Sequence, residues 1–389
     1  MIGVRGLAAA TLLHLVGACT TAPLQPVADL QPGERPAVQS DEAGLWMRMD
    51  AAEEELGTSG LIVTDPALSD YLRGITCRLS AEYCKDLRVY IVRGPQFNAT
   101  MSPNGTMKVW TGTLLRMQNE AQLAYVLGHE MSHYIRRHSV QRWRAIRSSA
   151  DGMAGLTVPA RMLGIGFIGE IADRAAMSSA AAHSREHERE ADEIGFELLV
   201  AAGYAGAEAP RVWESLEAER SATGRGNLAF AKTHPTTDRR VASLHAKAVA
   251  HGAQGRKSAA THIAAIQHLR AEWLRDELRR ADFEGTRVVL DNMLEAGHPR
   301  GVIHFYEGEL YRLRGSHGDI GRAIGAYRRA LASEEAPPET HRALGLMLWK
   351  SGRTGPAHDA LRAYLAAEPM AEDRAMIESY LRQLGRATP

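Results

Sequence analysis

Two histidines and an acid lie close together in the stretch LAYVLGHEMSHYIRRHSV, which covers residues 123–140. Residues four apart lie one above the other on a helix, so His129 and His133 can bind one metal ion from a single face. Neutral imidazole suits Zn²⁺, with bonds of about 2.0–2.1 Å. Glu130 is displaced by one position around the helix, where it can reach a water molecule on the metal. The spacing therefore predicts a site for one Zn²⁺ per chain, with Glu130 as the general base.

A catalytic zinc ion needs a third protein ligand and an open coordination position. The segment SREHEREAD, residues 184–192, is the obvious source of that ligand, and it offers Glu186, His187, Glu188 and Glu190. Spacing alone favours His187, because His183 and His187 form a second pair of histidines four residues apart. Residue types and spacing leave the choice between His187 and the acids open.

The two motifs together resemble a known family. H-E-x-x-H followed some tens of residues later by S-R-x-x-E-x-x-A-D is similar to the pattern of the zinc metallopeptidases related to the CAAX prenyl protease and the heat-shock protease HtpX. The resemblance implies that Glu188 is the third ligand. It also implies that Asp192, one helical turn further on, accepts a hydrogen bond from a ligating histidine. Peptide hydrolysis would follow, with Glu130 taking a proton from water and returning it to the leaving amine.

A third element, THPTTDRRV at residues 233–241, matches the H-P-x-x-x-x-R-[IV] pattern of the periplasmic branch of that family. The resemblance implies that His234 and Arg240 lie near the active site and take part in its chemistry. His234 would either stabilise the oxyanion of the tetrahedral intermediate or fill the open metal position and hold the enzyme latent. The residues alone also allow a structural interpretation, in which His234 caps the following helix and Arg240 pairs on the surface.

The elements that must position these groups are mostly helical. Hydrophobic periodicity predicts helices over 41–56, 65–80, 119–140 and 183–204. The alternating segment LRVYIVRG predicts a strand, and a Pro-Asn-Gly turn at 103–105 predicts a hairpin between two short strands. Residues 96–111 are the candidate sheet edge that would bind an extended substrate. The alternative is that this hairpin only braces the active-site helix.

The predicted fold class is α+β: a mostly helical, zincin-like peptidase domain over 41–255 with a small sheet, followed by a helical domain over 260–389. RAIGAYRRALA (322–332) and DALRAYLAAEP (359–369) resemble second helices of tetratricopeptide repeats. Stacked helix pairs leave a concave surface suited to peptides or proteins. An ordinary helical bundle is the alternative for this part of the chain.

The N-terminus, MIGVRGLAAATLLHLVGACT, has the layout of a signal peptide over residues 1–18. Its end, Val-Gly-Ala-Cys, resembles a bacterial lipobox, which implies cleavage before Cys19, lipid attachment to it and a position at the outer membrane facing the periplasm. Residues 19–40 would then be a flexible tether. The alternative is an ordinary cleaved signal with an incidental cysteine.

The remaining cysteines, Cys77 and Cys84, form a short-range disulfide or stay as two free buried thiols. The Gly- and Met-rich stretch over 151–182 is interpreted either as a mobile lid over the site or as a buried helix pair.

Lys plus Arg and Asp plus Glu both number 46, so no net charge attracts nucleic acid, and none is expected as a partner. The expected function is a zinc-dependent endopeptidase of the periplasm, acting on polypeptides such as misfolded outer-membrane proteins or with their assembly machinery through the repeats. The alternative is a chaperone or assembly scaffold with a latent or structural zinc site. A third possibility is a simple peptide-binding repeat protein. It would account for residues 260–389, but the motifs at 129–133 and 184–192 would then be coincidences.

Overall fold

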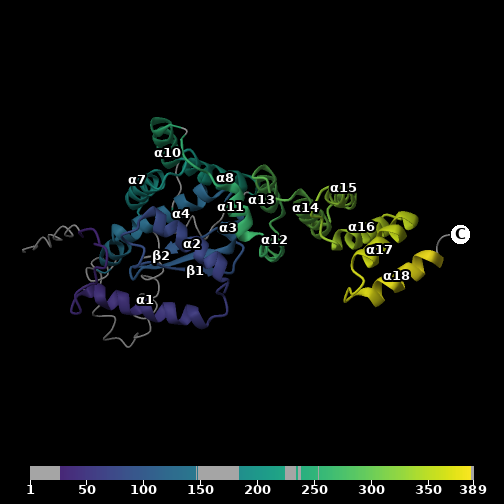
Figure 1. The fold of residues 1–389 in the computed structure, drawn as a ribbon, viewed down its shortest axis with the longest axis horizontal. Coiled ribbons are helices and arrows are strands. Elements are labelled where there is room, and N and C mark those ends of the chain that lie inside the picture. The colour runs from purple at the N-terminus through teal and green to yellow at the C-terminus, as the bar shows by residue number, and fades with distance from the viewer. Residues whose placement is uncertain are drawn as a thin grey trace, which may run out of the picture.

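The computed structural model describes residues 27–145, 147, 184–223, 234, 238–252 and 254–386. This part of the chain is mostly helical and contains a three-stranded sheet, which confirms the α+β class (Figure 1). Cys19 and the stretch 151–182 lie outside the described residues. Among the described helices, none combines the length and the apolar character that crossing a bilayer requires.

The sheet consists of β1 (Arg88–Val92), β2 (Ala99–Met101) and β3 (Thr106–Trp110) in the order β1-β3-β2. The predicted hairpin is confirmed, because β2 and β3 pair antiparallel across the Pro-Asn-Gly turn. β1 pairs parallel with β3, so β3 lies in the centre and β2 lies at an edge. Of the candidate edge over 96–111, only β2 therefore has an open side in the described sheet.

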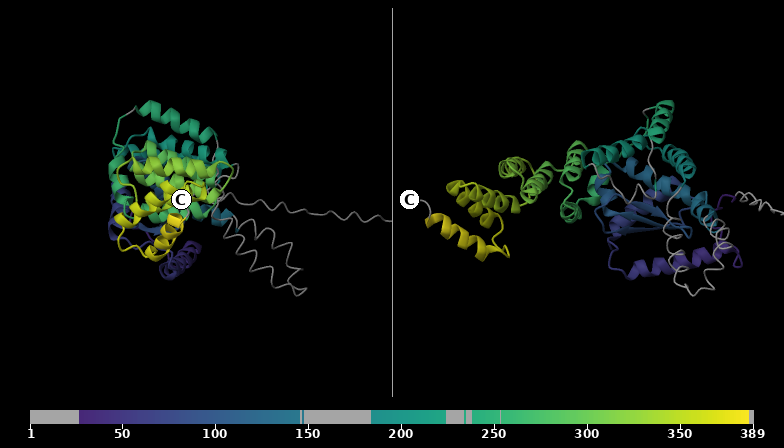
Figure 2. Two further views of the ribbon diagram at one scale, coloured as in Figure 1. Left: turned by 90° about the vertical axis from the view of Figure 1, so that its right-hand side faces the viewer. Right: turned by 180° about the vertical axis from the view of Figure 1, so that it is seen from behind.

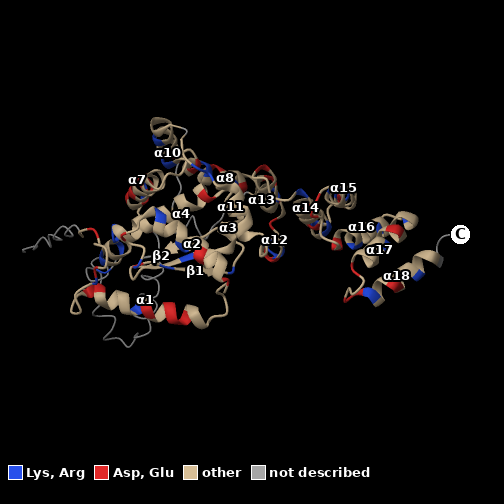
Figure 3. Ribbon diagram, viewed as in Figure 1, with Lys and Arg blue, Asp and Glu red and all other residues tan. Residues whose placement is uncertain are grey.

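Helix α1 (Asp41–Thr58), whose acidic residues Figure 3 shows in red, is joined to the sheet by Glu53. Arg88 donates two hydrogen bonds of 2.6 Å to the Glu53 carboxylate, and Thr106 donates a third of 2.6 Å. Burial by itself raises the pKa of a carboxyl group, but these donors, Arg88 foremost, outweigh it and lower the pKa of Glu53 to about 2. The ion pair explains why an acidic helix lies against a strand.

Helix α4 (Glu120–Ile135) is buried on all sides. The Asn119 side chain caps its N-terminus by accepting a 3.0 Å hydrogen bond from the Gln122 N–H. The prediction of a single helix over 119–140 is wrong at its C-terminal end, because α4 ends at Ile135. Arg137 adopts a left-handed conformation with φ of 55°, and residues 138–145 form a separate helical segment. The chain therefore turns back directly behind the last turn of α4.

Helix α7 (Arg185–Ala201) crosses α4 at two glycines. A Cβ built on Gly195 would lie 2.9 Å from the His129 backbone nitrogen, and one built on Gly128 would lie 3.2 Å from the Gly195 carbonyl oxygen. These distances leave no room for side chains, so the two helix backbones touch. The contact sets the distance between the two motifs.

The remaining elements of the N-terminal part surround these two helices. They are α2 (Pro66–Leu79), α3 (Thr111–Arg116), α8 (Glu208–Thr223) and α10 (Asp238–His251). Cys77 and Cys84 form a disulfide at the end of α2, which is one of the two states left open by the sequence. The buried Arg116 forms ion pairs with Glu219 and Glu277 at 2.7 and 3.0 Å, and so joins α3, α8 and α12 (Arg270–Arg279).

The C-terminal part is a run of helices that extends from the N-terminal part in Figures 1 and 2. These helices are α11 (Ala259–Ile266), α12 (Arg270–Arg279), α13 (Phe283–Glu295), α14 (Arg300–Arg314), α15 (Asp319–Leu331), α16 (Glu339–Lys350), α17 (Thr354–Ala367) and α18 (Arg374–Arg386). One buried core runs from the N-terminal part through α14, and a second joins α15 to α18. The domain division near residue 260 stays a prediction.

Two glycines bring consecutive C-terminal helices close together. A Cβ on Gly308 of α14 would lie 2.3 Å from the Tyr327 ring, and one on Gly345 of α16 would lie 2.8 Å from Leu361. The helices of each pair, α14 with α15 and α16 with α17, are thus in direct contact. Their identity as tetratricopeptide repeats stays a prediction.

The N-terminal tether is shorter than predicted. Leu30 is 2% exposed, and its N–H donates a 2.9 Å hydrogen bond to the Ile135 carbonyl at the end of α4. The Tyr83 hydroxyl donates a 2.6 Å hydrogen bond to the Leu30 carbonyl. Polar composition suggested a free linker to residue 40, but burial of Leu30 fixes this segment to the folded part of the chain.

Gly195→Ala tests the contact between α4 and α7. We expect the free energy of unfolding to fall by about 1–3 kcal/mol, because the new methyl group must push against the α4 backbone. The control is Gly44→Ala in α1, where no described atom lies within 4 Å of the added Cβ. This change should raise stability by about 0.5–1 kcal/mol. Urea unfolding measures both, and equal effects would contradict the close-contact argument.

Candidate metal centre

Helix α4 carries two histidines and a glutamate close together inside the protein. His129, Glu130 and His133 are each at most 2% exposed. The Nε2 atoms of the two histidines lie 3.2 Å apart. The four-residue spacing therefore places both imidazoles on one face.

Helix α7 brings Glu188 to the same point. Ser184 caps this helix by accepting a 3.1 Å hydrogen bond from the His187 N–H. The Glu188 carboxylate is fully buried, and its oxygens lie 3.5 Å from His129 Nε2 and 3.5 Å from His133 Nε2. His187, the rival ligand, instead stacks its ring on His138 at a centroid distance of 4.2 Å. Glu188 rather than His187 belongs to the donor group.

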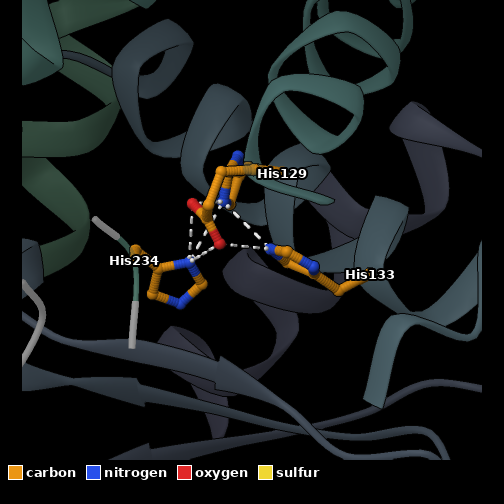
Figure 4. Close-up of side chains that lie close together, drawn as sticks. His129, His133 and His234 are labelled. Carbon is orange, nitrogen blue, oxygen red and sulfur yellow. Dashed lines mark hydrogen bonds and ion pairs between the residues drawn. The ribbon is translucent and has the colours of Figure 1, made fainter. Parts of the chain in front are cut away.

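His234 completes this group, as Figure 4 shows for the three histidines. Its Nδ1 lies 3.3 Å from His129 Nε2 and 3.0 Å from Glu188 Oε1. Its Nε2 lies 3.4 Å from Glu130 Oε1. The ligand atoms of His129, His133, Glu188 and His234 all lie within 4.8 Å of one another. Three imidazole rings and one carboxylate therefore converge on one point, as metal ligands do.

Asp192 and Arg240 hold this group from behind. Asp192 Oδ1 lies 3.1 Å from His129 Nδ1, the ring nitrogen opposite the donor atom. Arg240 donates two hydrogen bonds of 2.6 and 2.8 Å to Asp192, and its third nitrogen lies 2.8 Å from Glu188 Oε2. Arg240 is 5% exposed. It therefore bridges two carboxylates inside the protein and acts as a positioning residue, not as a surface pair.

The pKa values follow from these contacts. Burial by itself lowers the pKa of His129, but Asp192 and Glu188 outweigh it and raise the pKa to about 9. Burial alone raises the pKa of Asp192, yet Arg240 and His129 lower it to about 2. The Asp192 carboxylate is therefore ionised at neutral pH and can accept a hydrogen bond from the protonated Nδ1 of the His129 ring.

Two aromatic residues that the sequence analysis did not identify complete the support of Asp192. The Tyr125 hydroxyl donates a 2.7 Å hydrogen bond to Asp192 Oδ1, and Trp213 Nε1 donates a 3.1 Å hydrogen bond to that hydroxyl. The Arg240 guanidinium lies 4.6 Å from the Trp213 ring centroid. Tyr125 precedes His129 by one helical turn, which was a usable signal. Nothing in the spacing pointed to Trp213.

Glu130 is the exception in this network. Both of its carboxylate oxygens are buried and have no hydrogen-bond partner among the described residues. Burial raises the pKa of Glu130. A buried polar group without partners costs free energy, so such groups concentrate at functional positions. The arrangement leaves a proton acceptor beside the donor group.

The choice between the two rival ligands can be tested with Zn²⁺. Glu188→Gln removes the negative charge from the donor group, and we expect zinc affinity to fall by at least about 100-fold, since losing even a supporting group costs about 10–100-fold. His187→Gln should lower the affinity far less, because this ring lies outside the group and reaches it only through its stacking on His138. Competition with a chromophoric chelator measures both constants. A loss in His187→Gln alone would reverse the assignment.

Residues 65–248 match the model of Peptidase family M48. The chain is 29% identical over 164 residues to the mitochondrial metalloendopeptidase OMA1 of Schizosaccharomyces pombe, which covers 40% of this chain and 45% of the relative. It is 28% identical over 258 residues to a putative beta-barrel assembly-enhancing protease of Vibrio cholerae, which covers 61% of this chain and 52% of the relative.

The metalloprotease YcaL of Escherichia coli is 33% identical over 105 residues, which cover 26% of this chain and 40% of the relative. The chain thus spans about half or less of the length of these relatives. The matched region contains every residue of the donor group, together with Asp192 and Arg240, which support it. The relatives confirm the resemblance that was drawn from the two motifs. Residues 65–248 of this chain are therefore similar to the metallopeptidases of Peptidase family M48.

Proposed function

We propose that the chain is a zinc-dependent endopeptidase that hydrolyses peptide bonds with an activated water molecule. The observation that carries this proposal is the buried donor group of His129, His133 and Glu188 with the Glu130 carboxylate beside it, whose buried oxygens accept no hydrogen bond from the described residues. A metal site that only stabilised the fold would not need such a buried base. The cost of burying that base favours a role in proton transfer.

The distances within the group suit zinc. Ligand atoms around a tetrahedral ion are separated by about 1.6 times the bond length, or about 3.3–3.4 Å for bonds of about 2.0–2.1 Å. Five separations, counted to either oxygen of Glu188, are 3.0, 3.2, 3.3, 3.5 and 3.5 Å and lie close to this value, and all ligand atoms lie within 4.8 Å of one another. Imidazole and carboxylate donors are also the types that zinc peptidases use.

The chain's own residues divide the work of the reaction. Zinc in this site would polarise the scissile carbonyl and lower the pKa of a water molecule to about 7. Glu130 accepts the proton of the attacking water and passes it to the leaving amine. Asp192 keeps the His129 proton on Nδ1, so that Nε2 presents its lone pair to the donor group. Arg240 holds Asp192 and Glu188 in place.

The edge strand β2 is the proposed place for the substrate. It contacts α4, which carries His129 and Glu130, and only one of its sides is paired in the described sheet. A polypeptide added there as a further strand would lie extended beside the metal group. Residues Ala99–Met101 would bind its backbone, which gives affinity without a strong demand on sequence. The alternative is that the contact between β2 and α4 only braces this helix.

The proposed setting is the quality control or assembly of envelope proteins. Two curated relatives are named as beta-barrel assembly-enhancing proteases, which supports polypeptides of the outer membrane as substrates. We further propose periplasmic localisation, lipidation at Cys19 and tetratricopeptide-like recognition through α14–α17. These proposals rest on the sequence motifs and on the paired helices described above.

Glu130→Gln tests the catalytic proposal on residues 20–389. The amide cannot take a proton, so casein cleavage should fall by at least about 100-fold, the lower end of what a general base contributes. Zinc content should stay at about one ion per chain in both proteins, because Glu130 is not a ligand. Zinc without cleavage in either protein would reject the endopeptidase. No zinc in either would reject the ligand set.

A latched scaffold is the second candidate, and the position of His234 favours it. With Nδ1 facing the donor group and Nε2 facing Glu130, this ring occupies the place that the water molecule needs. This arrangement supports the latent state over the oxyanion role. His234→Ala should then raise casein cleavage at least several-fold with unchanged zinc content. Lower cleavage in this variant would instead favour the catalytic role of His234.

A further inference from the structure

A second histidine lies directly behind the ligand His133. His138 Nδ1 is 2.9 Å from His133 Nδ1, and His138 Nε2 is 2.9 Å from Glu190 Oε2. The His138 side chain is fully buried. None of the motifs that predicted the metal group includes His138, and Glu190 was considered only as a ligand.

The break at the end of α4 creates this contact. On one continuous helix, residues five apart are turned by about 140°, so His138 would point away from His133. Arg137 instead takes a left-handed conformation with φ of 55°, and the chain reverses. This reversal brings His138 back against the ring of His133. The strained residue therefore has a geometric consequence at the metal group.

The hydrogen bonds allow only one arrangement of protons when His133 Nε2 is a ligand. His133 Nε2 must then present a lone pair, so the proton of this neutral ring lies on Nδ1. That N–H donates to His138 Nδ1, which must accept and therefore carries no proton. His138 keeps its own proton on Nε2 and donates it to the Glu190 carboxylate. Each N–H in this series of hydrogen bonds, from His133 through His138 to Glu190, therefore has an acceptor.

From this geometry we propose that His138 and Glu190 are positioning residues that fix the tautomer and ring orientation of His133. The inference rests on the proposed metal site. It gives each ligating histidine its own support, Asp192 behind His129 and the His138–Glu190 pair behind His133. Such partners orient the ligand and raise its basicity.

Further contacts hold the pair in place. The His187 ring stacks on His138 with an interplanar angle of 13°. Arg136 lies 2.5 Å from the second oxygen of Glu190 and 2.5 Å from Asp29 in the N-terminal segment. The carboxylate of Glu190 is thereby turned toward His138, and His187, the rejected ligand, gains a structural role.

The test compares two variants of equal shape, His138→Leu and His138→Asn, in the full mature chain. Leucine removes the acceptor for His133 Nδ1–H, and we expect zinc affinity to fall by about 10–100-fold. The amide oxygen of asparagine can still accept that hydrogen bond, so this variant should keep clearly more of the parent affinity. Melting temperatures measured with a chelator report any loss of fold that is independent of metal.

A second pair keeps the proposal open to refutation if His138→Leu does not fold. Glu190→Ala should weaken zinc binding by about 10-fold. Glu186→Ala, an exposed acid on the same helix, should leave it unchanged. Equal zinc affinity in parent, His138→Leu and Glu190→Ala would overturn the proposal. So would an equal loss in His138→Leu and His138→Asn.

These outcomes separate the inference from the proposed function. Zinc binding without cleavage by the parent rejects the peptidase but leaves the affinity comparison decisive for His138. Cleavage by the parent with unchanged affinity in the variants rejects only the positioning pair. Failure of the parent to bind zinc overturns both.

Discussion

The close packing of α4 against α7 is the contact on which the rest of the site depends. Gly128 and Gly195 let the two helix backbones touch. Only at that separation can oxygens from one helix lie 3.5 Å from imidazole nitrogens of the other. The metal group is thus a product of backbone proximity.

Burial makes this arrangement an electrostatic problem as well. Glu188 and Asp192 lie in the interior, where an unpaired charge lowers the stability of the fold by roughly several kcal/mol. Arg240 contacts both carboxylates and neutralises one negative charge. The histidines supply the remaining compensation, and His129 does so by holding its proton more tightly than an exposed imidazole. A divalent cation would replace such protons, which links metal binding to proton release.

The sequence predicted the local parts of the site better than the distant ones. Helical spacing was enough for His129 and His133, and a turn-forming tripeptide was enough for the hairpin. Spacing could not separate Glu188 from His187, because both lie on α7 and only the crossing angle decides which one faces α4. The family resemblance supplied that choice.

Other features depended on tertiary structure that no local signal carries. The break at Arg137 occurs at a residue type that rarely adopts a left-handed conformation, so nothing in the sequence suggested a helix end. The parallel pairing of β1 with β3 and the support from Trp213 join segments far apart in the chain. Leu30 gave no periodic pattern, yet it is among the most buried residues.

Docking of the N-terminal segment limits how far the folded domain could lie from a lipid on Cys19. Cys19 and Asp29 are ten residues apart, and the domain begins where Asp29 and Leu30 bind it. A fully extended chain of that length reaches at most about 35 Å, about half of what a free segment to residue 40 would allow. With the proposed lipid on Cys19, the metal group would be confined to a thin layer next to the bilayer.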